Sequence, residues 1–534
     1  MVDRYAYARN RKLEGIFMNY VFNRCSATWV ALVVVVSSLV PLESAGETVE
    51  SVVIGSAKQL LIDDHVISKR VGVSRVFNPA EKSLANPIMR GEKPWEGKTI
   101  YVGSVLFDEE EQIFKMWYWV LNMSYIVPPK PFSQYENLMK AAQYKESFSL
   151  CYATSRDGLK WDRPNLGLVD FKGSTANNLL PPVTDGRMHN YAGIIKDMRD
   201  PNPARRYKAV AWRPKDAQGV FGVGVYFSPD GLHWTTHAGN PVIRDTSDVH
   251  TLLGWDERIK KYVAYFRPGS KQGIAPPAGN GLMRIIGYST SDDFEHWTPI
   301  VPALVPDEID PVDTQFYGMP VMKYEGMYLG FPWIFRTNLL THVPQLAFSR
   351  DGLRFTRTPL RGETIPLGAN GAFDDGNAYV VQPVAHNGKI WLYYTGTRWR
   401  GSYDLFELGD NVYDSIGLAT LPLDGFASIE AGPNVGTLTT KPMVFAGKEL
   451  TINMEASRKG YGIDEGTSVR VELLDAEGKA IPGFSVDDAV TNTATDLSQR
   501  VQWKGNPDLK LWAGKPVKLR FHLRNVKLYA FQFR

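Results

Sequence analysis

The sequence has little cysteine, no long apolar run and no excess of charge of one sign. Two cysteines in 534 residues exclude a scaffold stapled by disulfides. The 60 basic and 57 acidic residues nearly cancel, so composition gives no electrostatic basis for binding nucleic acid. The apolar run at 27–40 is shorter than the roughly 20 residues that span a bilayer. A chain of this length, with 44% hydrophobic residues, is therefore expected to form at least two domains with large cores.

The first 45 residues are typical of an export signal. Arg11, Lys12 and Arg24 precede the apolar run, and small residues follow it at 44–46. We expect a signal peptide over 1–45, a periplasmic or extracellular mature protein and no membrane span after removal of the signal. An uncleaved anchor is the alternative. The second cysteine, Cys151, would then stand alone, so no intrachain disulfide is expected.

One motif, Ser-x-Asp-Gly-x-x-Trp, organises the rest of the chain. It occurs at 155–161 and 228–234, and looser copies occur at 291–297, without the glycine, and at 349–355, with Phe for Trp. Asp-Gly favours a tight turn, because glycine accepts positive φ and aspartate bonds its own backbone. A strand-like run precedes each copy. A hairpin that recurs about every 60–70 residues is typical of propeller blades with four strands each.

Five further hairpins support this reading, because each begins with an apolar strand and returns with an aromatic one. The fifth turns at Asn387-Gly388, a strong hairpin signal. We predict an all-β protein, with a five-bladed β-propeller and an N-terminal lead-in over 46–433. Composition then changes to short alternating strands, which predict a β-sandwich over 434–534.

These motifs resemble the five-bladed propellers of glycoside hydrolase families 32, 43, 68 and 130, and a sandwich after the propeller is similar to family 32. The resemblance implies a protein that acts on glycans, but it assigns no catalytic residue. The family 32 stretches Trp-x-Asn-Asp-Pro-Asn-Gly and Glu-Cys are absent, and Arg199-Asp200-Pro201 falls in a hairpin loop of blade two. The site must therefore be argued from this sequence itself.

The first strand of a blade begins, and the second ends, at the same mouth of the central channel. Asp313 and Arg336 are 23 residues apart, and so are Asp375 and Arg398, which makes each pair diagonal neighbours on a hairpin. Both sets should therefore converge on one rim. Acids precede strand one in every blade, at Glu96, Asp185, Asp245, Asp248, Asp310, Asp313, Asp374 and Asp375. Arginines end strand two in four blades, at Arg213, Arg267, Arg336 and Arg398.

Glycoside hydrolysis needs two carboxyl groups, and crowding of acids raises the pKa of one of them. We therefore expect a glycoside hydrolase with Asp313, Asp375 and Glu96 as candidate catalytic carboxylates and Asp248 as a fourth. The arginines suggest an anionic sugar, a uronate or a sulfate ester. Aromatic residues at the rim, among them Trp399, are candidates to stack sugar rings. The remaining candidates for substrate binding are His189, His250, Tyr317 and Trp95.

Other interpretations stay open at this point. The Asp–Arg pairs are also explained as ion pairs that bolt adjacent strands. A glycan-binding propeller without catalysis needs the aromatics and arginines only, and a phosphorolytic enzyme like family 130 needs basic groups for phosphate. The sequence implies no cofactor and no metal, and no ligand spacing demands a structural Ca²⁺. It is silent on oligomeric state.

Overall fold

The computed structural model describes residues 50–97, 99–121, 148–183, 193–215, 217–219, 221–244, 246–268, 283–400, 414–456 and 466–534. The predicted signal peptide lies outside these ranges. Residues 50–534 form one compact unit, and nearly all regular secondary structure of its described residues is β-strand. Among the described residues, no helix is long and apolar enough to cross a membrane.

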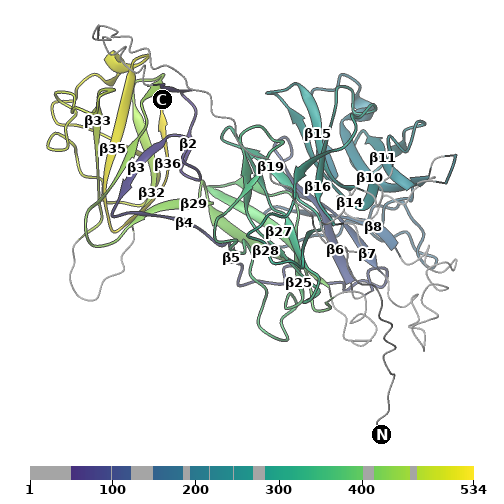
Figure 1. Cartoon of the computed structure of the whole chain (residues 1–534). Coiled ribbons are helices and arrows are strands. Elements are labelled where there is room, and N and C mark those ends of the chain that lie inside the picture. The colour runs from purple at the N-terminus through teal and green to yellow at the C-terminus, as the bar shows by residue number, and fades with distance from the viewer. Residues whose placement is uncertain are drawn as a thin grey trace, which may run out of the picture. The chain divides into compact units, whose positions relative to one another are not determined.

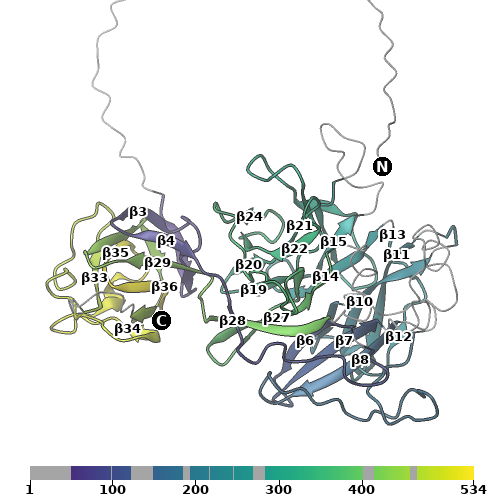
Figure 2. The ribbon, with the colours of Figure 1, turned by 90° about the horizontal axis from the view of Figure 1, so that it is seen from below.

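The strands of the predicted propeller form five mainly antiparallel sheets, one of which is shared by blades four and five, and their succession can be followed in Figures 1 and 2. Aromatic and β-branched residues of the strands meet between blades, where Trp117, Tyr226, Tyr265 and Tyr393 are buried completely or nearly so. Blade one contains β6 (Thr99–Asp108), β7 (Ile113–Leu121) and β8 (Phe148–Ser155). Blade two contains β9 (Gly193–Lys196), β10 (Tyr207–Lys215) and β11 (Phe221–Ser228), with β12 (Thr235–Thr236) and β13 (Ile243–Arg244) along its outer edge.

Blades three to five complete the propeller. The strands of blade four are divided between two sheets. Blade three contains β14 (Thr246–Asp256), β15 (Lys261–Pro268), β16 (Ile286–Ser291) and β17 (Val301–Leu304). Blade four contains β18 (Thr314–Phe316), β21 (Trp333–Arg336) and β22 (Thr341–Pro344), then β19 (Val321–Tyr324), β20 (Met327–Gly330), β23 (Ala347–Ser349) and β24 (Thr356–Arg357). Blade five contains β25 (Asn377–Val380), β26 (Val384–His386), β27 (Lys389–Thr397) and β28 (Ser415–Pro422).

The outer strand of blade five comes from the N-terminal side of the propeller. Strand β5 (Glu81–Lys82) pairs antiparallel with β28, with Lys82 opposite Ala419. The ammonium of Lys82 also lies 2.6 Å from the Asp374 carboxylate in the same blade. Segments about 340 residues apart in sequence thus share one sheet. This pairing joins the two chain ends of the propeller and covers an edge that would otherwise expose unpaired backbone groups.

The repeated turns link neighbouring blades through hydrogen bonds. In the second copy, Ser228 Oγ accepts from Gly231 N at 2.9 Å, and Asp230 Oδ1 accepts from two further backbone N–H groups. Gly231 has φ +81°, and its carbonyl accepts from Trp117 Nε1 of blade one at 2.7 Å. The carbonyl of Gly158 likewise accepts from Tyr393 of blade five at 2.9 Å. The motif therefore fixes the scaffold rather than carrying chemistry.

A second repeated arrangement links neighbouring blades where their first strands end, and the Ser-x-Asp-Gly motif gives no sign of it. Asp108 and Asp256 end a first strand and Asp197 directly follows one, and each accepts a hydrogen bond from a tyrosine hydroxyl of the next blade. Each also lies beside a lysine ammonium. The tyrosines are Tyr207, Tyr262 and Tyr328, and the lysines include Lys196, Lys208 and Lys323.

The sandwich differs from the predicted boundaries, because the lead-in joins it. Its first sheet has the order β1 (Val52–Gly55), β31 (Met443–Phe445), β35 (Pro516–Arg524), β30 (Gly436–Thr440) and β3 (Ile67–Val71), with β33 (Ser468–Leu474) also on β35. Its second sheet has the order β34 (Asp496–Arg500), β32 (Leu450–Ala456), β36 (Val526–Phe533), β29 (Ala427–Ala431) and β4 (Ser74–Phe77), with β2 (Gln59–Leu60) also on β36. Residues 52–77 and 427–431 thus belong to the sandwich sheets rather than to the predicted propeller at 46–433. Their apolar side chains, such as Ile54 and Ile429, enter the sandwich core.

Candidate functional site at the propeller rim

Strand register brings the starts of the first strands beside the ends of the second strands. Thr99 pairs with Leu121, Thr314 with Arg336, and Asn377 with Thr397. The described acids that precede the first strands and the described arginines that end the second strands therefore lie at one end of the propeller. We call this end the rim.

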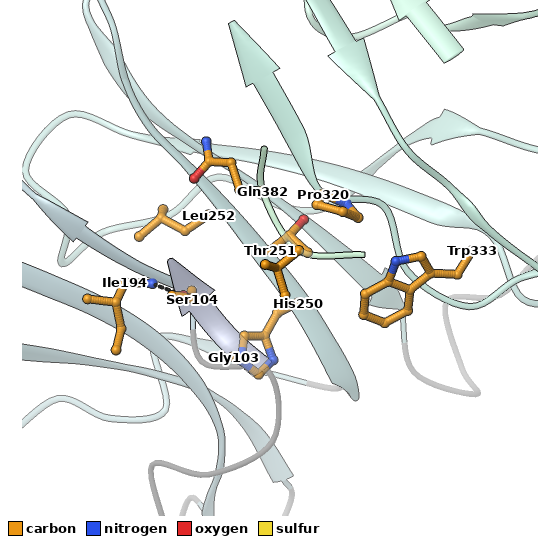
Figure 3. Close-up of a pocket in the computed structure, with 11 residues that line it drawn as sticks. Gly103, Ser104, Ile194, His250, Thr251, Leu252, Pro320, Trp333 and Gln382 are labelled. Carbon is orange, nitrogen blue, oxygen red and sulfur yellow. Dashed lines mark hydrogen bonds between the residues drawn. The ribbon is translucent and has the colours of Figure 1, made fainter. Parts of the chain in front are cut away.

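Below the rim, all five blades contribute to a narrow channel (Figure 3). Its volume is about 20 Å³, enough for one or two ordered waters but far too small for a sugar ring. His250 is fully buried in its wall, with Trp333 on the same lining. A hydrogen bond from Ile194 N to Ser104 Oγ, 3.0 Å long, ties the first two blades here. A ligand larger than a few waters would therefore have to bind outside the channel.

In blade four, the predicted Asp–Arg pair forms an ion pair. Asp313 Oδ1 lies 2.8 Å from both Nε and Nη2 of Arg336, and its other oxygen accepts from the backbone of Asn338 at 3.3 Å. Burial would raise the pKa of Asp313, but the hydrogen bonds and charge of Arg336 outweigh it and lower the pKa. Asp313 and Arg336 therefore form an ion pair that links two adjacent strands.

In blade five, the equivalent spacing does not produce an ion pair. Asp375 Oδ2 accepts from Gly371 N at 2.6 Å, four residues earlier in the chain. Asp375 Oδ1 and Arg398 Nε are buried and have no hydrogen-bond partner among the residues that the structure describes. A buried carboxylate oxygen without a partner is rare, because desolvation without a hydrogen bond costs about 1–3 kcal/mol.

The contacts of Glu96 do not fit its predicted role as a catalytic carboxylate. Its carboxylate is completely buried and accepts from Tyr118 Oη at 2.5 Å, from Arg163 Nε at 2.6 Å and from two backbone N–H groups. The neighbouring Trp95 donates its indole N–H to Asn178 at 2.8 Å. Both side chains are thus committed to contacts within blade one, a network that sequence spacing does not reveal.

Tyr317 lies at the centre of a cationic and aromatic cluster. Arg267 stacks over its ring at 4.1 Å, Arg284 lies 5.9 Å away, and His342 packs edge-on at 4.6 Å. Burial, reinforced by the two arginines, lowers the pKa of His342 to about 3, so this histidine is neutral at physiological pH. His342 was missed from sequence because it lies on the third strand of its blade. Its Nδ1 contacts Asn377 Oδ1 at 2.8 Å, which links blades four and five.

Asp414 was also missed, and it directly precedes the third strand of blade five. It is completely buried, and its oxygens accept from Trp399 Nε1 at 2.9 and 3.0 Å and from the Tyr101 hydroxyl. Burial raises the pKa of Asp414 to about 7. The available signal was position, because the third strand of a blade begins at the same end as the first.

Three candidates are not placed by the structure. His189 lies outside the described residues. The backbones of Asp248 and Arg213 lie in β14 and β10, but their side chains are not described. Among the described residues, no group of three or more His, Cys, Asp or Glu side chains is arranged to hold a metal ion.

No family model and no curated protein matches the chain. Solved structures similar to it include a putative glycosidase from Bacteroides thetaiotaomicron, with 14% identity, a TM-score of 0.41 and coverage of 64% of this chain and 95% of that one. Another comes from work on the GH130 family of mannoside phosphorylases and its hydrolases for β-1,2-mannosidic linkages, with 14% identity, a TM-score of 0.40, and 65% and 94% coverage. A third is the Bombyx mori GH32 β-fructofuranosidase, with 10% identity, a TM-score of 0.39, and 83% and 95% coverage. Because these identities are 14% or lower and the TM-scores are about 0.4, the function of this chain must be argued from its own residues.

Proposed function

We propose that this protein is an exported glycoside hydrolase that cleaves its substrate at the rim, with Asp375 as one of the two reacting carboxylates. The observation that carries the proposal is the state of Asp375. One oxygen is fixed by a backbone N–H and the other is buried without a partner among the described residues. Because such a group is costly, it is found where a substrate or reaction supplies the missing contact.

The second carboxylate is a choice between Asp248 and Asp313. Both come from blades next to one another, at the starts of first strands. Asp313 is held ionised by Arg336, which suits a base or nucleophile but not a group that donates a proton. We therefore propose Asp313 for the ionised role and keep Asp248, whose side chain is not described, as the alternative.

The substrate class follows from the cations at the rim. Arg267 and Arg284 converge on Tyr317, and Arg398 has a buried Nε without a partner among the described residues. Guanidinium groups bind carboxylates and sulfates through forked hydrogen bonds. We propose a uronic or sulfated glycan.

The test is release of reducing sugar by residues 46–534 from neutral, uronic and sulfated glycans, with binding measured in parallel. Asp375→Asn should lower kcat by at least about a hundredfold, because hydrolysis loses one of its two carboxyl groups. Asp292→Asn, an exposed aspartate paired with Lys261, is the matched control and should retain activity. Binding without release from any glycan would overturn the hydrolase in favour of a glycan-binding propeller. Turnover that requires phosphate would indicate phosphorolysis.

A further inference from the structure

The side chain and backbone of Trp399 are fixed separately. Its indole N–H donates to both oxygens of Asp414, at 2.9 and 3.0 Å. Its carbonyl accepts from Asn377 Nδ2 at 2.6 Å and from Thr397 Oγ1 at 3.1 Å. The residue is nevertheless only half-buried, so part of its surface is open to solvent. A half-exposed tryptophan held this firmly has lost its rotamer freedom before any ligand arrives.

Asp414 holds aromatic groups from two blades at once. It accepts from Trp399 at the end of β27 in blade five and from the Tyr101 hydroxyl of β6 in blade one. The Tyr101 ring stacks on Trp119, with centroids 3.9 Å apart and planes 6° apart. Because both Asp414 oxygens are engaged and the residue has no exposed surface, its carboxylate does not reach a substrate. Its effect must pass through the aromatic residues.

The backbone at Trp399 also lies beside the segment that carries Asp375. The next residue, Arg400, donates from Nη2 to the backbone oxygen of Asp375 at 3.2 Å. Gly376 packs so closely that a Cβ there would stand 2.6 Å from the Trp399 carbonyl oxygen. The segment that carries the indole is therefore in contact with the segment that carries Asp375.

We propose that Trp399 stacks against a sugar ring of the glycan in a subsite beside Asp375, and that Asp414 is the positioning residue of this subsite. The inference rests on the proposed function of the rim. The C–H face of a sugar ring packs on a flat indole, and a pre-fixed aromatic gives this contact without a further loss of conformational freedom.

The charge of Asp414 connects this subsite to pH. Among the described residues, the groups facing Asp414 are the Tyr101 hydroxyl from β6, the Trp399 indole and the backbone of residues 99–100, where Ile100 N donates to the Asp414 carbonyl at 3.2 Å. Since burial raises the pKa of Asp414 to about 7, its carboxylate gains or loses its charge near neutrality. Protonation weakens acceptance from the indole, so glycan binding should weaken below pH 7.

The first measurement is binding of a panel of neutral, uronic and sulfated oligosaccharides to the mature protein and its variants. Trp399→Ala should weaken binding by about tenfold or more, corresponding to about 1.4 kcal/mol per tenfold. Trp399→Phe keeps a ring but loses the bond to Asp414, and its effect should be smaller. Trp297→Phe is the matched control, because this half-buried indole donates to the Phe294 carbonyl of a structural turn. It should bind as wild type.

The second measurement follows the indole without any ligand. In protein labelled with 5-fluorotryptophan, the ¹⁹F resonance that disappears in Trp399→Phe belongs to Trp399. It should shift with an apparent pKa near 7 in wild type and stay fixed in Asp414→Asn. A resonance that does not respond to pH in wild type would overturn the role of Asp414.

The outcomes separate this inference from the hydrolase proposal. Binding without turnover that is weakened by Trp399→Ala leaves the subsite and removes the hydrolase. Normal turnover and binding by Trp399→Ala removes the subsite and leaves the hydrolase. If no oligosaccharide of the panel binds the wild-type protein, the subsite is overturned.

Discussion

Asp414 makes a prediction about stability that does not depend on knowing the substrate. Burial raises the pKa of this carboxyl from the ordinary value of 3.8 to about 7 in the folded protein. The folded protein therefore binds the proton more tightly than the unfolded chain does. The resulting contribution to stability is complete below about pH 4 and is lost as the pH rises to 7.

The magnitude follows from the size of the shift. A displacement of about three pH units corresponds to about 4 kcal/mol, at about 1.4 kcal/mol per unit. Asp414→Asn has nearly the same shape, keeps an oxygen acceptor for Trp399 and Tyr101, and does not titrate. Near pH 4 the variant should be about as stable as the wild type. By pH 8 it should be more stable by up to about 4 kcal/mol.

Two assays check this expectation. Urea unfolding at half-unit pH steps should give a difference between variant and wild type that grows steadily from pH 4 to 7 and then levels. Proton release on unfolding at pH 5.5 should be nearly one proton larger for wild type than for Asp414→Asn. Trp399→Phe removes one donor to the Asp414 carboxylate. In this variant the contribution of Asp414 to stability should therefore be lost at a higher pH than in the wild type. A stability difference that is constant with pH would refute the reasoning.

Two further substitutions, each with a control, test the contacts between blades by urea unfolding. Asp108→Asn removes a fully buried carboxylate that two lysine ammoniums share, which leaves each lysine only an exposed glutamate as its acidic partner among the described residues, and should cost about 3–5 kcal/mol, whereas Glu110→Gln, at a side chain 56% exposed, should cost less than about 1 kcal/mol. Equal losses would contradict the buried network. Gly231→Ala should cost about 2–4 kcal/mol, because φ is +81° and the new Cβ would stand 2.7 Å from Trp117 Cζ2. Gly326→Ala, with φ +77° and no atom within 4 Å, should lose only about 1–2 kcal/mol.

The propeller was predictable because its repeat is local. Ser-x-Asp-Gly-x-x-Trp closes a turn with bonds inside seven residues, and aromatic second strands mark each hairpin. The closing strand β5 and the sandwich strands from 52–77 were not predictable in this way. Their partners lie more than 330 residues away, and no pattern within a short strand such as Glu81–Lys82 names the partner.

The site was predictable in position but not in composition. Comparing strand starts and ends placed Asp313 and Arg336 together at the rim, and their contact follows from register. The same spacing failed for Asp375, because its carboxylate turns back to Gly371 instead of crossing to Arg398. A carboxylate has several donors within reach, and spacing along the chain does not rank them.

Carboxylates at both ends of the propeller lie beside cations, as Asp313 lies beside Arg336 at the rim, but two carboxylates at the rim are exceptions. At the end of the first strands, Asp108, Asp197 and Asp256 each lie beside a lysine ammonium and a tyrosine hydroxyl, an arrangement that stabilises the scaffold. At the rim, the described donors to the carboxylates of Asp375 and Asp414 are a backbone N–H, an indole and a hydroxyl, none of them charged. Without a neighbouring cation, Asp414 can change protonation near neutral pH, and Asp375 remains available to a substrate. A scaffold that pairs most of its buried acids with cations gains no stability from leaving two of them without one at the rim, so function is the better explanation for these two.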